Sequence, residues 1–150
     1  MEELEKKDKT FERISFIIPF SDEQTLLTPN TKISLGGGEF PKRKDLSLRI
    51  GFVGLLPGID YEAKVFVSPI LMQMKVGDSQ QLANPFTEIA TINLATKKTE
   101  GESIVDGQVT VNLENFKFIS KGIYKITVSI STKDNKNKVL HENNSFVTIE

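Results

Sequence analysis

The apolar and polar residues of this chain alternate in the way that β-strands do. After residue 10, apolar side chains recur at every second position, which is the spacing that buries one face of a strand. The clearest case is residues 122–131, where Tyr124, Ile126 and Val128 oppose Lys125 and Thr127. The same spacing predicts strands in RISFIIPF, LSLRIGFVG, YEAKVFV, PILMQMKV, EIATINLA, GQVTVNLE, VLHEN and SFVTIE. In the first of these segments it places four side chains on one face: Ile14, Phe16, Ile18 and Phe20.

This pattern predicts an all-β fold. No window of a dozen residues carries the apolar stripe of a helix, and residues 2–10 are too polar and too few to form a stable one alone. One-sided alternation is typical of antiparallel sheets. We therefore expect residues 11–150 to form a single antiparallel two-sheet sandwich of about eight strands, preceded by a charged leader at residues 1–10.

The composition excludes some classes of function but does not specify one. The chain has 150 residues, no cysteine, and 19 Lys+Arg against 20 Asp+Glu. The absence of cysteine excludes disulfides and thiolate chemistry and agrees with a reducing compartment. Balanced charge provides no field that would attract nucleic acid or an anionic membrane. The first ten residues lack the apolar run of a secretory signal. We expect a cytoplasmic protein with no nucleic-acid or membrane partner.

One segment carries a family resemblance. In FISKGIYKITVSI (118–130), Tyr124 follows Gly122 by two residues, as in the tyrosine corner of immunoglobulin-like sandwiches. Ser120 stands where many such domains have aspartate, and the chain has no cysteine pair and no tryptophan, so it does not resemble an antibody domain. Together with LLPGIDYEAKVFV (55–67), the segment is similar to small bacterial immunoglobulin-like domains of unknown function. The resemblance implies an immunoglobulin-like fold and a structural role for Gly122 and Tyr124.

The stretch KISLGGGEFPKRK (32–44) raises the question of phosphate binding. A phosphate loop needs a helix after its glycines, because helix-terminal amides hold the anion. Here Gly36, Gly37 and Gly38 are followed by Glu39 and then by a predicted strand. We expect an ordinary connection between strands, followed by a solvated basic strand entrance at residues 42–44.

Other candidate chemistry is sparse. His141 is the only histidine, and its position near a turn predicts an exposed side chain. No sequence motif for a calcium loop, a nucleophilic serine or a cofactor is present, and we expect no cofactor. The acidic stretch TEGESIVDG (99–107) leaves a calcium site or a metal-assisted hydrolase open as an alternative. Carboxylates are otherwise scattered, at Asp22, Glu23, Asp60, Asp78, Glu100, Glu102, Asp106 and Asp134.

The segment SPILMQMKVG (68–77) is the most suggestive surface candidate. Pro69 is compatible with an edge strand, methionines adapt to irregular partners, and an edge strand can pair with another chain. The alternative is that these side chains fill the core. The predicted partner-binding edge consists of Ile70, Met72, Met74 and Val76.

These observations favour a non-catalytic binding or protein–protein interaction module with a protein partner. A structural subunit of a phage or surface assembly is a second interpretation, in which copies associate through exposed strand edges. The third is the metal-dependent binding domain or hydrolase named above.

Overall fold

The computed structural model describes residues 11–20, 32–70, 88–96 and 105–150. It confirms the predicted all-β, two-sheet sandwich of eight strands. Within the described ranges no helix is long and apolar enough to cross a membrane. The strands are β1 (Arg13–Phe20), β2 (Lys32–Ile33), β3 (Lys42–Leu55), β4 (Asp60–Pro69), β5 (Glu88–Ala95), β6 (Val105–Phe118), β7 (Gly122–Thr132) and β8 (His141–Ile149).

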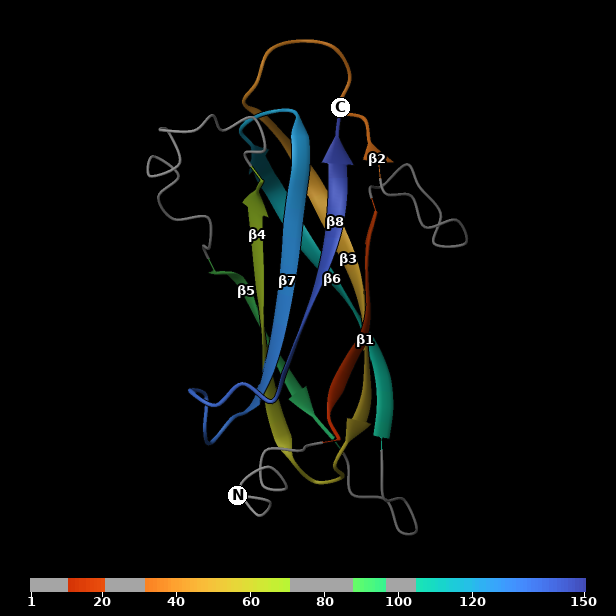
Figure 1. Ribbon diagram of the computed structural model, residues 1–150, viewed down its shortest axis with the longest axis vertical. Coiled ribbons are helices and arrows are strands. Elements are labelled where there is room, and N and C mark those ends of the chain that lie inside the picture. Colours follow the sequence, from red (N-terminus) through yellow and green to blue (C-terminus); the bar gives the residue numbers. More distant parts are fainter. Residues whose placement is uncertain (1–10, 21–31, 71–87, 97–104) are drawn as a thin grey trace, which may run out of the picture.

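The two sheets differ in size. Sheet A has the order β1-β3-β6, and sheet B has the order β2-β8-β7-β4-β5. Figure 1 shows β4, β7 and β8 in front of β3 and β6, with β1 beside β8. Neighbouring strands are antiparallel except for the short parallel pair β2 and β8. Three strands therefore face five, and sheet A is the narrower layer.

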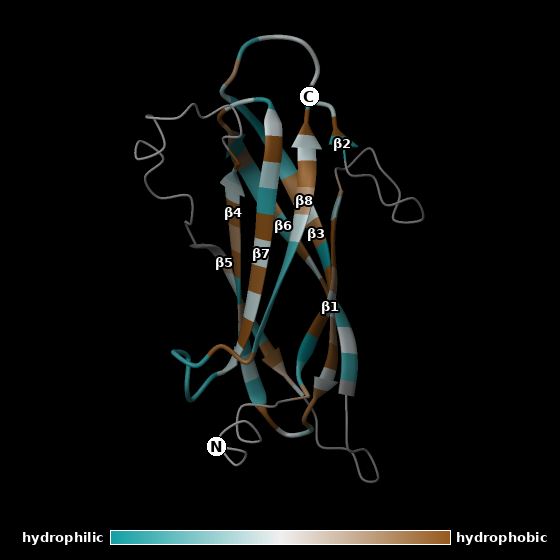
Figure 2. Ribbon diagram, viewed as in Figure 1, coloured by the Kyte–Doolittle hydropathy of each residue, from teal (hydrophilic) through white to brown (hydrophobic). Residues whose placement is uncertain are grey.

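The core lies between the sheets and is built from alternate residues of the long strands. Figure 2 shows apolar and polar positions alternating along β7. Its inward residues Tyr124, Ile126 and Val128 are at most 1% exposed, as are Tyr61 and Ala63 of β4. Burial of this apolar surface is the main stabilising term of the fold. The period-two pattern of the sequence thus identifies the core correctly in the central strands.

The predicted strand RISFIIPF is confirmed as β1, but the prediction that its four apolar side chains share one face is wrong. A β-bulge shifts the pairing of β1 with β3 between Ile14 and Phe16. One extra residue reverses the faces of everything that follows, because side chains in a strand alternate. Ile14, Ile17 and Pro19 are therefore buried, whereas Phe16, Ile18 and Phe20 are half-buried on the other face of sheet A.

The strands β8 and β2 also differ from the prediction. VLHEN and SFVTIE were predicted as separate strands, but β8 runs through both from His141 to Ile149. The short strand β2 has no alternation of its own to predict it, since it contains only Lys32 and Ile33. It is held by its parallel pairing with Thr148 and Ile149.

Candidate functional site

One lateral side of the sandwich is closed by β1 and β8, and we call it the closed side. The backbone N–H of Ile14 donates to Nδ1 of His141 at 2.9 Å, and Nδ2 of Asn143 donates to the carbonyl oxygen of Ile14 at 3.0 Å. Both backbone groups of one β1 residue are therefore satisfied by side chains of the other sheet. The apolar residues beside them are sealed, since Ile17 is 7% exposed and Val147 is 1% exposed.

His141 is half-buried, so the expectation of an exposed side chain is wrong. Burial lowers the pKa of His141 below its usual value of 6.5, and the positive charge of Arg13 lowers it further. The bond from Ile14 requires a neutral imidazole with Nδ1 unprotonated. This histidine therefore acts as a hydrogen-bond acceptor between the sheets.

A second connection between the sheets lies beside the closed side, just before β1 begins. The hydroxyl of Tyr61 donates to Oε2 of Glu12 at 3.0 Å and accepts the N–H of Leu56 at 2.8 Å. Glu12 is only 5% exposed. Burial, together with the hydrogen bond and charge of Glu12, raises the pKa of Tyr61 to about 12, against the lowering effect of the Leu56 N–H. The phenol is thus a donor to a buried carboxyl group at ordinary pH.

The opposite lateral side lies between the edge strands β5 and β6, and we call it the open side. Among the described strands, β5 pairs only with β4, and β6 pairs only with β3. The inward apolar residues of these edge strands pack against the core but stay half-buried, and they are Ala90, Ile92, Leu94, Val109 and Val111. The apolar side chains at the open side are therefore more exposed than those at the closed side.

A hollow of about 260 Å³ lies at the open side, at the end of the sandwich where β3 and β5 end and β6 begins. Its apolar lining comes from both sheets and consists of Phe52, Leu55, Leu94, Ala95 and Val109. Its polar lining consists of Asn93, Thr96 and Gln108, with Gly107 completing the wall. None of the described residues that line the hollow is an acid or a base. This described lining is suited to holding an apolar group.

Gly107 explains why this space exists. It is paired with Phe52, whose side chain is inward and 2% exposed, so a side chain at position 107 would also face inward. A Cβ added to Gly107 would meet no atom within 4 Å. A glycine at an inward strand position thus leaves the hollow unfilled.

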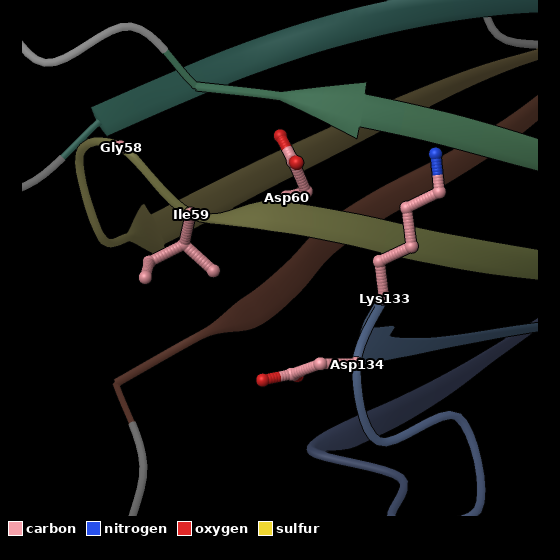
Figure 3. A pocket seen from close by; sticks show the side chains of 5 residues that line it. All are labelled: Gly58, Ile59, Asp60, Lys133 and Asp134. Carbon is pink, nitrogen blue, oxygen red and sulfur yellow. The ribbon is translucent and has the colours of Figure 1, made fainter.

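A second hollow, of about 200 Å³, lies on the surface beside the start of β4 and is lined by Gly58, Ile59, Asp60, Lys133 and Asp134. Figure 3 shows the carboxylates of Asp60 and Asp134 pointing in different directions. Across the described ranges, no three His, Cys, Asp or Glu side chains come together as metal ligands. Most of the acidic stretch 99–107 lies outside the described residues. The scattered carboxylates that the structure does describe thus form no candidate metal centre.

The glycine loop connects β2 to β3, as expected, and its polarity is opposite to that of a phosphate loop. Nζ of Lys42 donates to the carbonyl oxygens of Leu35 at 3.3 Å, Gly36 at 2.8 Å and Gly37 at 2.6 Å. The ammonium also lies 5.4 Å from the centre of the Phe40 ring. The loop therefore directs carbonyl oxygens, rather than amides, towards a charge that the chain itself supplies.

Tyr124 is 1% exposed, and its hydroxyl is bound to the backbone just upstream. It donates to the carbonyl oxygen of Ser120 at 2.9 Å and accepts the N–H of the same residue at 3.2 Å. Gly122 has φ of 124°, which favours glycine. The hydroxyl thus fixes the turn between β6 and β7.

Most of the predicted partner-binding edge lies outside the described residues, namely Met72, Met74 and Val76. Ile70 is described, and its N–H donates to the carbonyl oxygen of Ile123 at 2.8 Å. Ile70 therefore continues the pairing of β4 with β7 beyond Phe66, the last residue of β4 that pairs with β5.

The chain is similar in structure to several solved β-sandwich proteins at very low sequence identity. A bacterial adhesin from Mobiluncus mulieris aligns with a TM-score of 0.53 and 9% identity, over 94% of this chain and 58% of the adhesin chain. The C-terminal domain of wzt aligns with a TM-score of 0.53 and 7% identity, over 95% and 75%. A Niemann-Pick type C2 protein from the Japanese carpenter ant gives a TM-score of 0.49 and 13% identity, over 93% of each chain. No protein-family model and no curated protein matches the chain.

The two alignments with a TM-score of 0.53 support the β-sandwich fold, and the function is argued from the site. Sequence reasoning did not identify the open side. The only local signal is Gly107 at an inward position of an otherwise alternating strand, where glycine is depleted. That signal can be read only when the register of β6 against β3 is known.

Proposed function

We propose that this protein is a non-catalytic protein–protein interaction module that binds apolar groups of its partner at the open side. The observation that carries this proposal is the hollow beside Gly107, which has an apolar floor and a rim of uncharged polar residues. Sites that bind apolar groups are concave and apolar, with a few polar groups to orient the ligand. The described residues that line the hollow are apolar or uncharged, and such a lining supports binding of an apolar group.

We also propose that the sandwich is of the immunoglobulin-like type. The support is the Tyr124 hydroxyl bound to the backbone of Ser120, four residues upstream, at the turn before β7. The tyrosine corner of immunoglobulin-like domains makes this contact at an equivalent strand start. A cytoplasmic location and the absence of nucleic-acid or membrane partners are further proposals, which rest on the balanced charge of the sequence.

The test of the binding proposal uses an apolar fluorescent probe, 1-anilinonaphthalene-8-sulfonate, with the folded protein at neutral pH. We expect the wild type to enhance the probe's fluorescence and Gly107→Val to lose most of that enhancement, because the new side chain occupies the hollow. Gly37→Val is the matched control, since a Cβ at this exposed loop glycine also meets nothing within 4 Å. Equal enhancement by all three proteins, or none by the wild type, would contradict the proposal.

A structural subunit is the second candidate function, and it is favoured by the edge of β6 that has no partner among the described strands. An edge strand can pair with the same strand of another copy and so build an oligomer. Native mass spectrometry distinguishes the two functions. We expect a monomer for the interaction module, whereas a defined homo-oligomer that dissociates on substitution in β6 would favour the structural one.

A further inference from the structure

The edge of β6 has the features of a strand that accepts another strand. One edge of β6 pairs with β3 along most of its length, from Lys42 with Phe118 to Leu55 with Val105. Among the described strands, no other strand pairs with the second edge. On an edge strand, backbone amides and carbonyls that no group of the same chain satisfies bond to water or to another chain.

The middle of β6 carries none of the features that usually block such pairing. Natural edge strands are protected by proline, lysine, inward-facing charges or bulges. The segment Gly107–Leu113 reads GQVTVNL and contains no proline and no charged residue. Its pairing with β3 is regular, and the nearest register shifts lie beyond it at both ends. This segment is therefore a smooth, uncharged template for pairing.

The difference in width between the sheets provides room for one more strand. The inward residues Ile92 and Leu94 belong to β5, at the edge of the five-stranded sheet, while sheet A ends at β6. A strand added beside β6 would widen sheet A to four strands on the side of β5. Its inward side chains would cover Val109, Val111 and the half-buried residues of β5.

The size of the hollow points to one large side chain of a peptide rather than to a whole small molecule. Pockets for drug-sized ligands measure roughly 300–1,000 Å³, and this one measures about 260 Å³. The missing side chain of Gly107 places the hollow in line with the inward positions of β6. An apolar residue of an added strand can enter it from the β6 edge.

We propose that the open side binds an extended peptide segment of a partner protein, which pairs with Gly107–Leu113 as a fourth strand of sheet A and inserts one large apolar side chain beside Gly107. This inference rests on the proposed function and specifies its ligand. The recognised segment has apolar residues at alternate positions facing inward. Its outward residues lie beside Gln108, Thr110 and Asn112, which are uncharged.

The experiment selects ligands from a phage-displayed library of random 12-residue peptides on the immobilised wild-type protein. We expect enriched peptides to share large apolar residues spaced by two. Synthetic versions should bind Gly107→Val at least tenfold more weakly than the wild type and should bind the control Gly37→Val equally well. A library that yields no enriched peptide, or peptides that bind Gly107→Val as well as the wild type, overturns the proposal.

Backbone methylation tests strand pairing without changing the protein, so it remains decisive if Gly107→Val fails to fold. Two forms of the best peptide are made, with N-methyl groups on one or the other alternate set of amides. We expect one form to bind at least tenfold more weakly, because its amides face β6, and the other to bind nearly normally. Equal binding of both forms and the parent overturns strand addition.

The outcomes also separate this inference from the proposed function. If the fluorescent probe binds at the open side but no peptide shows the methylation pattern, the binding site stands and the strand ligand is wrong. If neither probe nor peptide distinguishes the wild type from Gly107→Val, both proposals fail. A peptide-free homodimer in native mass spectrometry would replace the partner peptide with a second copy of β6.

Discussion

The closed and open sides of the sandwich differ in how backbone groups are satisfied and apolar residues are buried at the strand edges. At the closed side, His141 and Asn143 of β8 satisfy the backbone of Ile14, and Ile14 is only 2% exposed. At the open side, the inward residues of β5 and β6 remain half-buried, and β6 keeps an edge with no described strand partner. Side-chain hydrogen bonds thus complete one side within the chain. At the other side, the described part of the chain leaves these apolar residues half-buried.

The largest expected effect comes from comparing a tightly packed strand glycine, Gly54 of β3, with the open glycine Gly107. Gly54 has φ of 75°, and a Cβ there would collide with the carbonyl oxygen of Phe11, just before β1. Strained φ and overpacking each cost about 1–3 kcal/mol, so Gly54→Ala should lower the free energy of unfolding by about 3 kcal/mol or more. Gly107→Ala, at the open side, should leave it unchanged or raise it by up to about 1 kcal/mol.

Urea denaturation of both variants and the wild type measures this difference. Similar destabilisation by the two alanines would mean that position 107 is as tightly packed as position 54, and the open space beside Gly107 would be contradicted.

The next effect concerns the hydrogen bond of Tyr61 to the buried Glu12. Tyr61→Phe removes the hydroxyl that donates to the Glu12 carboxyl group. We therefore expect the free energy of unfolding to fall by about 1–3 kcal/mol. The pKa of Tyr61, raised to about 12, adds a pH test. Because the pKa of Tyr61 in the folded protein exceeds the unfolded value of 10.0, the tyrosine's contribution to the free energy of unfolding is complete below pH 10. It disappears as the pH rises through about 12. Thermal melts between pH 9 and 12 should therefore fall less steeply for Tyr61→Phe than for the wild type.

Two asparagines compare the sides directly. Asn143→Leu removes the donor to the carbonyl oxygen of Ile14 and should cost about 1–2 kcal/mol of unfolding free energy. Asn93→Leu changes an exposed residue at the rim of the open side and should stay within about 0.5 kcal/mol of the wild type. Chemical denaturation measures both. A larger loss for Asn93→Leu would show that the open side, too, depends on its polar residues for stability.

The smallest effect is the pH dependence of the closed side. The pKa of His141 is lowered in the folded protein. The contribution of His141 to the free energy of unfolding is therefore present above pH 6.5 and is lost as the pH falls through the folded pKa. Protonation turns Nδ1 from an acceptor into a donor and removes the bond from Ile14. His141→Gln cannot titrate, so its melting temperature should change less than that of the wild type between pH 7 and 5. Parallel curves would show that another group controls stability in this range.

Sequence alone predicts the strands well where period two is uninterrupted, as in β4 and β7. In β1 it predicts the strand but not which side chains face inward. The bulge depends on pairing with β3 and leaves no mark in the alternation of Ile14, Phe16 and Ile18. The spacing of Gly122 and Tyr124 is local, and the hydroxyl contact with Ser120 involves neighbouring residues that one sequence window contains.

Lateral sides are harder to predict because they depend on strand order. The contact between Ile14 and His141 joins residues that lie 127 positions apart. Likewise, the role of Gly107 depends on its opposite residue, Phe52. Alternation assigns residues to faces, but it does not say which strands become edges or which edges meet.

The strand order also has a consequence for synthesis. Sheet A combines two strands from the beginning of the chain with β6, and Leu46 finds its partner in Leu113. Ribosomes add about 5–20 residues per second, so β3 emerges several seconds or more before the strand that completes its sheet. During that interval the apolar residues of β3, such as Leu46, Leu48 and Ile50, lack the strand that pairs with this edge. Newly made chains are therefore expected to need protection by chaperones until β6 to β8 have been translated.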